Sequence, residues 1–329
     1  MNSFKALVAH FKETTNLQYE TKDLSFLVHG TVLIKTLYSS INYKDYLATK
    51  PSGNVAKINP LIPGIDAVGI VIEDSTNTYQ VGLKVIVSGP QFGVAAHGGF
   101  SEYIRANISD VYPLPNGLSE QHAAILGTAG FTAMQSILAL MKHGLDQKID
   151  ARILVTGATG GVGSSAIYLL KKLGYRDISA LTRQSEHQRW LGALGAKTVV
   201  TLEEIVGDSN KPLNTQKYDY IIDCVGGDVA ASLLPFISYG GSISMCGHAA
   251  GTKFQTTVFP MILRGINILG IDSVGLSYQQ KEEIWEKIAD LRIDQTIEVI
   301  KHEISFSELK TELEYYGMNP HLGRIVVKY

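Results

Sequence analysis

Between residues 151 and 271 the chain alternates short apolar runs with amphipathic, helix-like segments. We predict six strands in this region: Arg152–Thr156, Asp177–Thr182, Thr198–Val200, Tyr218–Cys224, Ser242–Cys246 and Ile266–Ile271. We expect helices after the first, second and fourth strands: Gly163–Lys172, Glu186–Leu194 and Val229–Phe236. Parallel neighbours need a connection long enough to cross back over the sheet. The pattern therefore predicts an α/β domain with a doubly wound parallel sheet, the Rossmann architecture.

The first 120 residues and the last 60 have a different pattern of apolar and turn-forming residues. Short apolar runs alternate with turn residues such as Pro63-Gly64 and Gly89-Pro90, which favours an irregular antiparallel β-barrel. The expected strands there are Phe4–Val8, Val32–Leu37, Ala67–Ile72, Lys84–Val87 and Ser101–Arg105. The tail is predicted to form helices Tyr278–Leu291 and Ser307–Tyr316 and a final strand, Gly323–Val327. We expect residues 1–122 and 271–329 to form one discontinuous catalytic domain, with residues 123–270 inserted as the dinucleotide-binding domain.

Composition narrows the possible partners. A chain of 329 residues is long enough for two domains, and its net charge of −2 gives no reason to expect nucleic acid or an anionic membrane. The sequence shows no run of about 18 purely apolar residues, so no membrane span is expected. The N-terminal residues lack the apolar run of a signal peptide. We therefore expect a cytoplasmic protein that acts on a small molecule.

The chain has only two cysteines, Cys224 and Cys246. Both lie at the ends of predicted buried strands, so small core residues are the expected role and a redox role the alternative. The sequence offers no cluster of thiolates and imidazoles at the spacing that structural zinc requires.

A glycine-rich segment joins the first predicted strand to the first predicted helix. It reads Gly157-Ala158-Thr159-Gly160-Gly161-Val162-Gly163. Glycines at such a turn let the backbone approach a pyrophosphate, whose charge is stabilised by amides at the helix N-terminus. The spacing is GxxGxxG rather than GxGxxG. The alternative is a strand-to-helix turn with no ligand, but the α/β context favours dinucleotide binding.

The end of the second strand suggests which dinucleotide is bound. NAD-binding domains usually place Asp or Glu there, on the ribose 2′-hydroxyl. Here the strand ends in Thr182 and Arg183, and no acid follows until Glu186. A hydroxyl and a guanidinium suit a 2′-phosphate, so NADP(H) is favoured. The alternative is that Arg183 is only a solvated surface residue.

These motifs resemble the medium-chain dehydrogenase/reductase superfamily, and most closely its zinc-free quinone-oxidoreductase branch, the YhdH/YhfP type that includes acryloyl-CoA reductases. The matching segments cover nearly the whole chain. They are Ser40–Asp45, Ile62–Asp66, Gly127–Ala133, Thr156–Gly163, Tyr239–Ser242, Ile262–Gly265, Gly270–Ser273 and Gly323–Val327. The resemblance implies a GroES-like catalytic domain, a Rossmann domain and commonly a homodimer. We expect that homodimer to pair through the apolar strand Ile266–Ile271, because an uncovered apolar edge strand favours aggregation.

The resemblance also separates this chain from its zinc-dependent relatives. Those proteins carry a cysteine ligand in the segment matching 42–45, and Gly-His-Glu where this chain has Gly64-Ile65-Asp66. Isoleucine cannot ligate a metal, so we predict that no metal takes part. Hydride transfer without a Lewis acid suits conjugated alkenes or quinones.

The resemblance implies which residues form the site. Catalytic candidates are Tyr43, Asn42 and Asp45, whereas Asp66 is expected to support its loop. Tyr43 would either donate a hydrogen bond or proton to the substrate carbonyl or simply pack on the nicotinamide. Cofactor contacts are expected at Tyr43, Thr159, Gly160, Gly161, Val162, Thr182, Arg183, Thr201, His248, Ile262, Ser273 and Asn319.

Three functions remain open at this point. The leading hypothesis is NADPH-dependent reduction of an activated double bond, with acryloyl-CoA as the substrate. The second is NADPH:quinone reduction with the same cofactor. The third, of another class, is a non-catalytic dinucleotide-binding sensor. A CoA substrate needs cations for its phosphates, and the candidates are Lys50, Lys57 and Arg264.

Overall fold

The computed structural model describes residues 3–12, 15–183, 185–209, 211–317 and 321–329. The chain divides into two compact units. The first unit comprises Met1–Thr128, Val274–Ile293 and Lys301–Tyr329, and the second comprises Ala129–Ser273 and Asp294–Ile300. The domain boundaries expected at residues 122 and 270 stay predictions.

The second unit contains a parallel sheet of six strands in the order β10-β9-β8-β11-β12-β13. Its strands are β8 (Ile153–Val155), β9 (Ile178–Leu181), β10 (Thr198–Val200), β11 (Tyr218–Asp223), β12 (Ile237–Met245) and β13 (Asn267–Gly270). The order reverses between β8 and β11, which makes that pair the switch point where ligands of such sheets bind. The predicted doubly wound sheet is confirmed.

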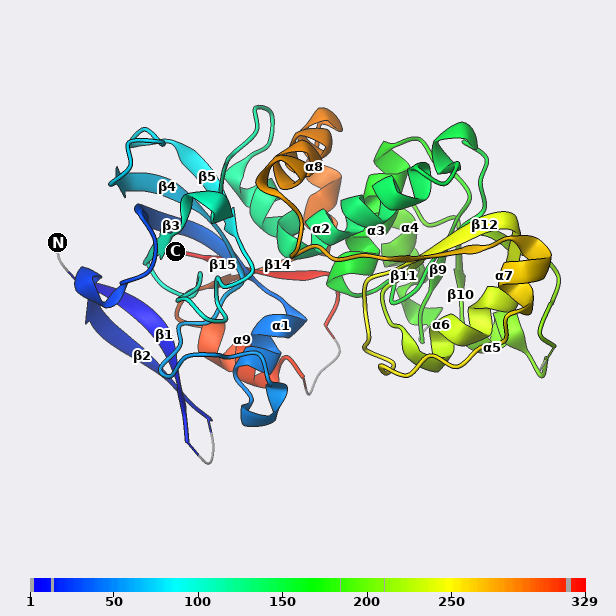
Figure 1. The fold of residues 1–329 in the computed structure, drawn as a ribbon, viewed down its shortest axis with the longest axis horizontal. Helices are drawn as coiled ribbons and strands as arrows, with labels where there is room; N and C mark the ends of the chain where they lie inside the picture. The colour runs from blue at the N-terminus through cyan, green and yellow to red at the C-terminus, as the bar shows by residue number, and fades with distance from the viewer. Residues whose placement is uncertain (1–2, 13–14, 184, 210, 318–320) are drawn as a thin grey trace. The chain divides into compact units, whose positions relative to one another are not determined.

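Helices connect these strands (Figure 1). They are α3 (Gly161–Lys172), α4 (Gln188–Leu194), α5 (Leu202–Val206), α6 (Gly227–Leu233) and α7 (Phe259–Arg264). The helix predicted over 229–236 begins and ends earlier, because Pro235 has no N–H to continue the α-helical ladder, and residues 234–236 form a 3₁₀ turn. Leu154, Ile221 and Ile243, from three central strands, are fully buried in the core of the unit.

The first unit is predominantly antiparallel. It has a hairpin, β1 (Ser3–Phe11) with β2 (Thr15–Asp23), and a sheet in the order β14-β15-β3-β4-β5-β7, with β6 paired to β3. The strands of that sheet are β3 (Val32–Ile41), β4 (Asp66–Asp74), β5 (Lys84–Ser88), β6 (Tyr103–Ala106), β7 (Val111–Pro113), β14 (Lys301–Ser305) and β15 (Arg324–Lys328). The C-terminal strand β15, red in Figure 1, pairs with the N-terminal strand β3, blue, so the unit is closed by both ends of the chain.

The helices with residues in this unit are α1 (Tyr43–Ala48), α2 (Glu120–Met141), α8 (Tyr278–Asp290) and α9 (Leu309–Tyr315). Helix α2 runs from the first unit into the second and is interrupted at Gly127, whose φ is 48° and ψ is −151°. Elements α1, α2, β2 and β7 were not predicted from the sequence. Strand β2 lacks a clear apolar alternation because it buries only Leu17 fully.

The expectation that no segment spans a membrane stays a prediction. Among the described residues, α2 is long and apolar enough by length and composition. Most of it is buried within the folded chain, as is usual for a core helix.

Candidate functional site

The glycine-rich turn of the second unit lies at the C-terminal end of β8. Gly157 has φ +57°, and a Cβ on Gly163 would lie 2.3 Å from the carbonyl oxygen of Gly157. A larger residue at 163 would therefore push helix α3 away from the strand. Gly160 is the N-cap of α3, and the cap has no side-chain hydrogen bond. Residues 159–162 are only half-buried. The turn thus presents backbone amides at the N-terminus of a 12-residue helix, as an anionic ligand requires.

A hydrogen-bond network joins this turn to the adjacent strand β11. The hydroxyl of Thr156 donates to Oδ1 of Asp223 at 2.7 Å and accepts from the amide of Cys224 at 2.9 Å. Oδ2 of Asp223 accepts from the amide of Gly226 at 2.8 Å. Burial raises the pKa of Asp223. The ends of β8 and β11 are therefore held together at the switch point.

The residues predicted to bind the adenosine ribose and its 2′-phosphate lie at the C-terminal ends of β9 and β10. Thr182 follows β9 and is 6% exposed, whereas Arg183 is exposed to solvent. Thr201 follows β10 and is the N-cap of α5, in a reciprocal capping box with Glu204. The structure thus brings Thr182, Arg183 and Thr201 to one edge of the sheet. Of these three residues, only Arg183 is classed as exposed to solvent.

The other predicted cofactor residues do not all gather at this edge. His248 follows β12 and is exposed, and Ser273 follows β13 and is half-buried. Ile262 lies on α7 and is 67% exposed. The last residue of that helix, Arg264, donates to the carbonyl of Ile237, where β12 begins. The end of α7 thus contacts the start of β12, and a cofactor contact at Ile262 stays a prediction. Asn319 lies outside the described residues.

The sequence made Arg264 a candidate for binding the CoA phosphates, but in the structure its side chain binds backbone carbonyls instead. Its guanidinium donates to the backbone carbonyls of Asn214, Pro235 and Ile237. These bonds hold the start of β12, so Arg264 is a structural residue.

The catalytic candidates of the first unit lie where β3 leads into α1. Asn42 is the N-cap of α1, and Asp45 is its N3 residue. Oδ2 of Asp45 accepts from the Asn42 amide at 2.8 Å, and Oδ1 accepts from the amide of Ile65 at 2.8 Å. Asn42 is 8% exposed and Asp45 is fully buried. Their side chains are positioned to orient α1.

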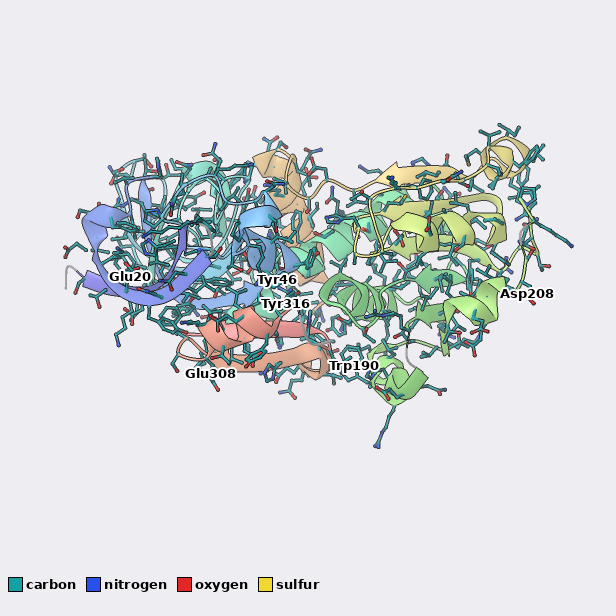
Figure 2. The ribbon with its side chains drawn as sticks, turned by 90° about the horizontal axis from the view of Figure 1, so that it is seen from below. Glu20, Tyr46, Trp190, Asp208, Glu308 and Tyr316 are labelled. Atoms are coloured by element: carbon teal, nitrogen blue, oxygen red, sulfur yellow. The ribbon has the colours of Figure 1, made fainter. Side chains whose placement is uncertain are left out.

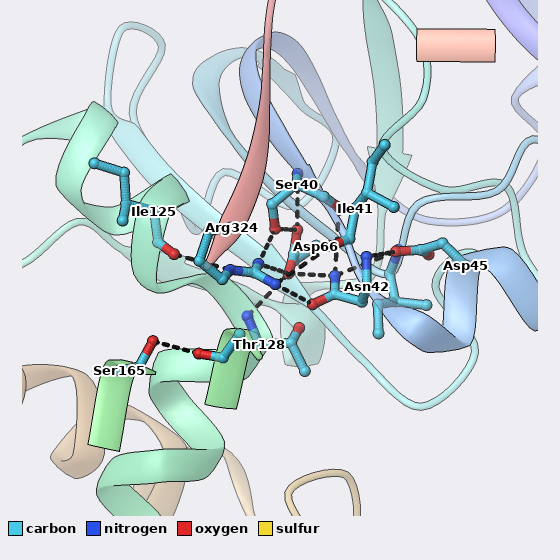
Figure 3. Close-up of polar contacts among 11 residues, drawn as sticks. Ser40, Ile41, Asn42, Asp45, Asp66, Ile125, Thr128, Ser165 and Arg324 are labelled. Atoms are coloured by element: carbon cyan, nitrogen blue, oxygen red, sulfur yellow. Dashed lines mark hydrogen bonds and ion pairs between the residues drawn. The ribbon is translucent and has the colours of Figure 1, made fainter. Parts of the chain in front are cut away.

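Arg324, the first residue of β15, is the centre of this polar cluster (Figure 3). Its Nη1 lies 3.1 Å from Oδ1 of Asn42, and Nε lies 3.0 Å from the carbonyl oxygen of Ile125. Nη2 donates to Oγ of Ser40. The guanidinium is 2% exposed, so a buried positive charge from the end of the chain fixes the residue just before Tyr43.

Asp66 completes the cluster. Its Oδ1 accepts from the hydroxyl of Ser40 at 2.6 Å. Its Oδ2 accepts from Nδ2 of Asn42 and from the amide of Thr128, both at 2.9 Å. That amide follows the interruption of α2 at Gly127, so Asp66 caps the second half of the helix. These contacts join the start of β4 to β3 and α2, and the expected support of its loop by Asp66 stays a prediction.

The cluster contains two carboxyl groups and one guanidinium. Burial, and then the nearby charge of Asp66, raise the pKa of Asp45 from 3.8 to about 7. Asp45 is therefore protonated in part of the molecules near neutral pH. Its full burial favours a positioning role over direct contact with a substrate.

Tyr43 begins α1 and is 48% exposed, in contrast to its buried neighbour Asn42. It starts a row of aromatic rings. The ring centroids of Tyr43 and Tyr46 are 6.2 Å apart, and those of Tyr46 and Tyr316 are 6.0 Å apart. Figure 2 shows Tyr46 beside Tyr316. Burial raises the pKa of Tyr316 to about 12, so its hydroxyl stays protonated. The row gives α1 an aromatic surface beside the cluster.

Sequence reasoning did not assign roles to Arg324, Ser40 and Gly127. Arg324 stands out as a lone cation before the apolar run Ile325-Val326-Val327, and this was the available signal. The partners of Arg324 lie up to 284 positions away in the sequence. The proposed roles of Tyr43, Asn42 and Asp45 in catalysis stay predictions.

The fold and these sites together define a class, the two-unit dinucleotide-binding dehydrogenases and reductases. Two family models match the chain. "Alcohol dehydrogenase GroES-like domain" covers residues 28–116, and "Zinc-binding dehydrogenase" covers residues 161–290.

Individual relatives show which family within this class the chain belongs to. The chain is 40% identical over 328 residues to "Putative quinone oxidoreductase YhfP" of Bacillus subtilis, covering 99% of this chain and 98% of the relative. It is 39% identical to "Acrylyl-CoA reductase AcuI" of Ruegeria pomeroyi, covering 91% of each. The yhdH oxidoreductase of Salmonella enterica, solved in complex with NADP, matches with a TM-score of 0.92 and 34% identity over 99% of each chain. The solved structure of YhfP itself has NAD bound and gives a TM-score of 0.96 at 38% identity over the full length of both chains. This chain belongs to the YhdH/YhfP type of the medium-chain dehydrogenase/reductase superfamily.

One of the matching family models is named for zinc and covers residues 161–290, whereas the carboxylates of the candidate site, Asp45 and Asp66, lie within the range 28–116 of the other model. Asp45 and Asp66 face donors from Asn42 and Arg324 rather than further anionic ligands. Across the described part of the chain, no group of three His, Cys, Asp or Glu side chains could hold a metal. We therefore derive no step through a metal ion.

Proposed function

We propose that this protein is an NADPH-dependent reductase of activated double bonds, with acryloyl-CoA as its substrate. The observation that carries the proposal is the 39% identity to an acrylyl-CoA reductase over 91% of both chains. In the balanced reaction, one hydride from NADPH and one proton convert acryloyl-CoA to propionyl-CoA and NADP⁺. The hydride forms the new C–H bond at the β-carbon, and the proton adds to the α-carbon.

The second unit fits this cofactor. The turn at Gly157 and the close packing at Gly163 leave room for a pyrophosphate at the amides of 160–162. The exposed guanidinium of Arg183 suits a 2′-phosphate. Bound NADPH would supply the hydride, and the side chains of this chain supply binding and orientation.

In the first unit, Tyr43 is the residue we propose to meet the substrate. Its half-exposed side chain is presented by the first turn of α1, whose start is held by Asn42, Asp45 and Arg324. A tyrosine hydroxyl there can donate to the thioester oxygen as negative charge develops on it. Lys50 and Lys57 remain the proposed cations for the CoA phosphates. The ammonium of Lys50 lies 4.7 Å from the Tyr46 ring centroid, and that of Lys57 donates to the carbonyl of Asn54.

Quinone reduction is the second candidate, because the relative YhfP carries that name at 40% identity. It requires the same hydride donor but no site for CoA phosphates. The decisive experiment measures NADPH oxidation with acryloyl-CoA, crotonoyl-CoA and benzoquinone side by side. We expect the highest kcat/KM with acryloyl-CoA. A higher value with benzoquinone would replace the first proposal by the second, and no turnover of any acceptor would favour a dinucleotide-binding sensor.

We also propose a cytoplasmic homodimer that pairs through edge strand β13. Ile268 on this strand is 39% exposed, and within the described part of the chain no further strand pairs beyond it. Ile268→Lys should shift the sedimentation coefficient to that of a monomer. Ile72→Lys is a matched control, because Ile72 is also 39% exposed but lies on β4 of the other unit. A wild-type monomer at micromolar concentration would exclude this pairing.

A further inference from the structure

The only two cysteines of the chain lie side by side at the cofactor edge of the parallel sheet. Cys224 directly follows β11 and Cys246 directly follows β12. The two strands are in register up to the pair Asp223 and Met245, and the amide of Cys246 donates to the carbonyl of Asp223 at 2.9 Å. The two Sγ atoms are 3.9 Å apart. Both residues are partly exposed to solvent.

We propose that Cys224 and Cys246 form a reversible disulfide when a peroxide oxidises the protein, and that a bound dinucleotide protects them. Neighbouring strands lie roughly 4.8 Å apart, which falls within the separation of about 4.4–6.8 Å between Cα atoms that a disulfide spans. The sulfurs need to approach each other by the difference between 3.9 Å and the usual bond length of about 2.0 Å. Rotation of the two side chains and a small shift of the strand ends can provide this approach.

The directions of the pKa shifts in the pair favour Cys246 as the attacking thiol. The Cys246 thiol donates to the carbonyl of Asp223 at 3.3 Å and towards Sγ of Cys224 at 3.9 Å. The hydrogen bond between the two sulfurs lowers the pKa of Cys246 and raises that of Cys224. The hydroxyl of Ser136 also lowers the pKa of Cys246. Two thiols at this distance therefore have different reactivities, as expected for an attacking and a resolving cysteine.

The proposed reaction balances with hydrogen peroxide as the only added oxidant. The Cys246 thiolate attacks one peroxide oxygen, the O–O bond breaks, and the product is a sulfenic acid and, after protonation, water. The Cys224 sulfur then attacks the sulfur of the sulfenic acid. The S–S bond forms as the S–O bond breaks, and a second water leaves with the proton of Cys224. The two sulfurs together lose two electrons, and the peroxide gains them.

The position of the pair connects its oxidation to cofactor binding. The amide of Cys224 donates to the hydroxyl of Thr156, which immediately precedes the glycine turn. A Cβ on Gly157 would lie 3.5 Å from the Cβ of Cys224. A Cβ on Gly247 would lie only 1.9 Å from the carbonyl oxygen of Cys224, so the backbone after Cys246 is already packed closely on Cys224. A movement that joins the sulfurs therefore disturbs the strand ends that hold the turn.

The test treats the full-length protein, free of cofactor, with equimolar hydrogen peroxide and measures its intact mass. We expect a loss of two hydrogen atoms, restored by dithiothreitol, and a peptide that links Cys224 to Cys246. In Cys224→Ser, dimedone should instead label Cys246, whereas Cys246→Ser should react much more slowly. Oxygen atoms added to both cysteines without a linked peptide, or a link between two chains, would overturn the proposal.

A second arm tests the protection. NADPH at saturating concentration should slow the mass change at least tenfold, and the oxidised protein should bind NADPH at least tenfold more weakly until it is reduced. Circular dichroism before and after reduction shows whether the oxidised chain is still folded. If NADPH does not bind to the reduced protein, the proposed function is wrong. The intact mass still shows in that case whether the disulfide forms. If NADPH binds and does not protect, the link between the pair and the cofactor is wrong.

Discussion

Nη1 of Arg324 lies 3.1 Å from Oδ1 of Asn42, although 282 positions separate the two residues in the chain. Asn42 caps α1, and Tyr43 is the first residue of that helix. The start of the C-terminal strand therefore fixes the direction in which α1 presents Tyr43. Burying the charge of Arg324 costs free energy, and this contact gives the buried guanidinium a hydrogen-bond partner.

Gly127 should be among the least replaceable glycines of the first unit. Its φ is +48°, and a Cβ there would lie 2.8 Å from polar atoms of Arg324, Asp66 and Ser40. Gly127→Ala should lower the free energy of unfolding by more than the roughly 1–3 kcal/mol expected for the backbone conformation alone. Gly240→Ala is the control, because Gly240 has φ +70° and nothing within 4 Å of its added Cβ. Equal losses for the two variants in urea denaturation would show that the cluster tolerates the methyl group.

Replacing the hydroxyl of Tyr43 tests its proposed role. Tyr43→Phe should lower kcat on the order of 100-fold, because loss of one donor to a developing oxyanion typically has that effect. NADPH affinity should stay almost unchanged. Tyr315→Phe is the matched control, because Tyr315 on α9 is similarly exposed, at 52% against 48%. Steady-state kinetics with a wild-type kcat for Tyr43→Phe would reduce Tyr43 to a packing residue.

Arg183 should decide the preference for NADPH over NADH. A charge-assisted hydrogen bond to a 2′-phosphate corresponds to about ten- to a hundredfold in affinity. Arg183→Ala should lose this factor for NADPH and leave the affinity for NADH nearly unchanged. Arg189→Ala, an exposed arginine on α4, should bind both cofactors like the wild type. Fluorescence titrations that show an equal loss of affinity for both cofactors in Arg183→Ala would contradict this prediction. The comparison is informative because the solved structure of YhfP has NAD bound.

Asp45 should give the protein a characteristic pH dependence. Its pKa is 3.8 in the ordinary state and about 7 in the fold, mainly because of burial. Between these values the folded state keeps a proton that the unfolded state has released. The contribution of Asp45 to the free energy of unfolding therefore falls as the pH rises from 3.8 to about 7 and levels off above that.

Asp45→Asn should remove this contribution to the slope, since the amide does not titrate. The exposed Asp290 at the end of α8 offers a control, and Asp290→Asn should retain the wild-type slope. Denaturation curves at several pH values check both variants. A slope that is the same in Asp45→Asn as in the wild type would show that another group causes the dependence.

The parallel sheet could be predicted from the sequence because its information is local. Each buried strand, such as β8 or β11, is a short apolar run, and three of the connections have a helical pattern, so the class of the sheet follows from the chain, whereas the strand order does not. The glycine turn is equally local: the residues that set its conformation and those that present the amides lie within seven positions. Helix α2 and strand β2 escaped prediction because glycine and polar residues interrupt their patterns.

The sequence by itself thus determined the α/β class, the glycine turn, and the candidates Tyr43 and Arg183 at the start of a helix and the end of a strand. Only the tertiary structure decided which partners the other candidates contact. It buried Asn42 and Asp45 in a cluster with Arg324, assigned Arg264 to backbone carbonyls, and placed the sulfurs of Cys224 and Cys246 3.9 Å apart. The physical reason is that charge neutralisation and thiol pairing depend on distance in space, and the partners come from strands whose pairing no local pattern specifies.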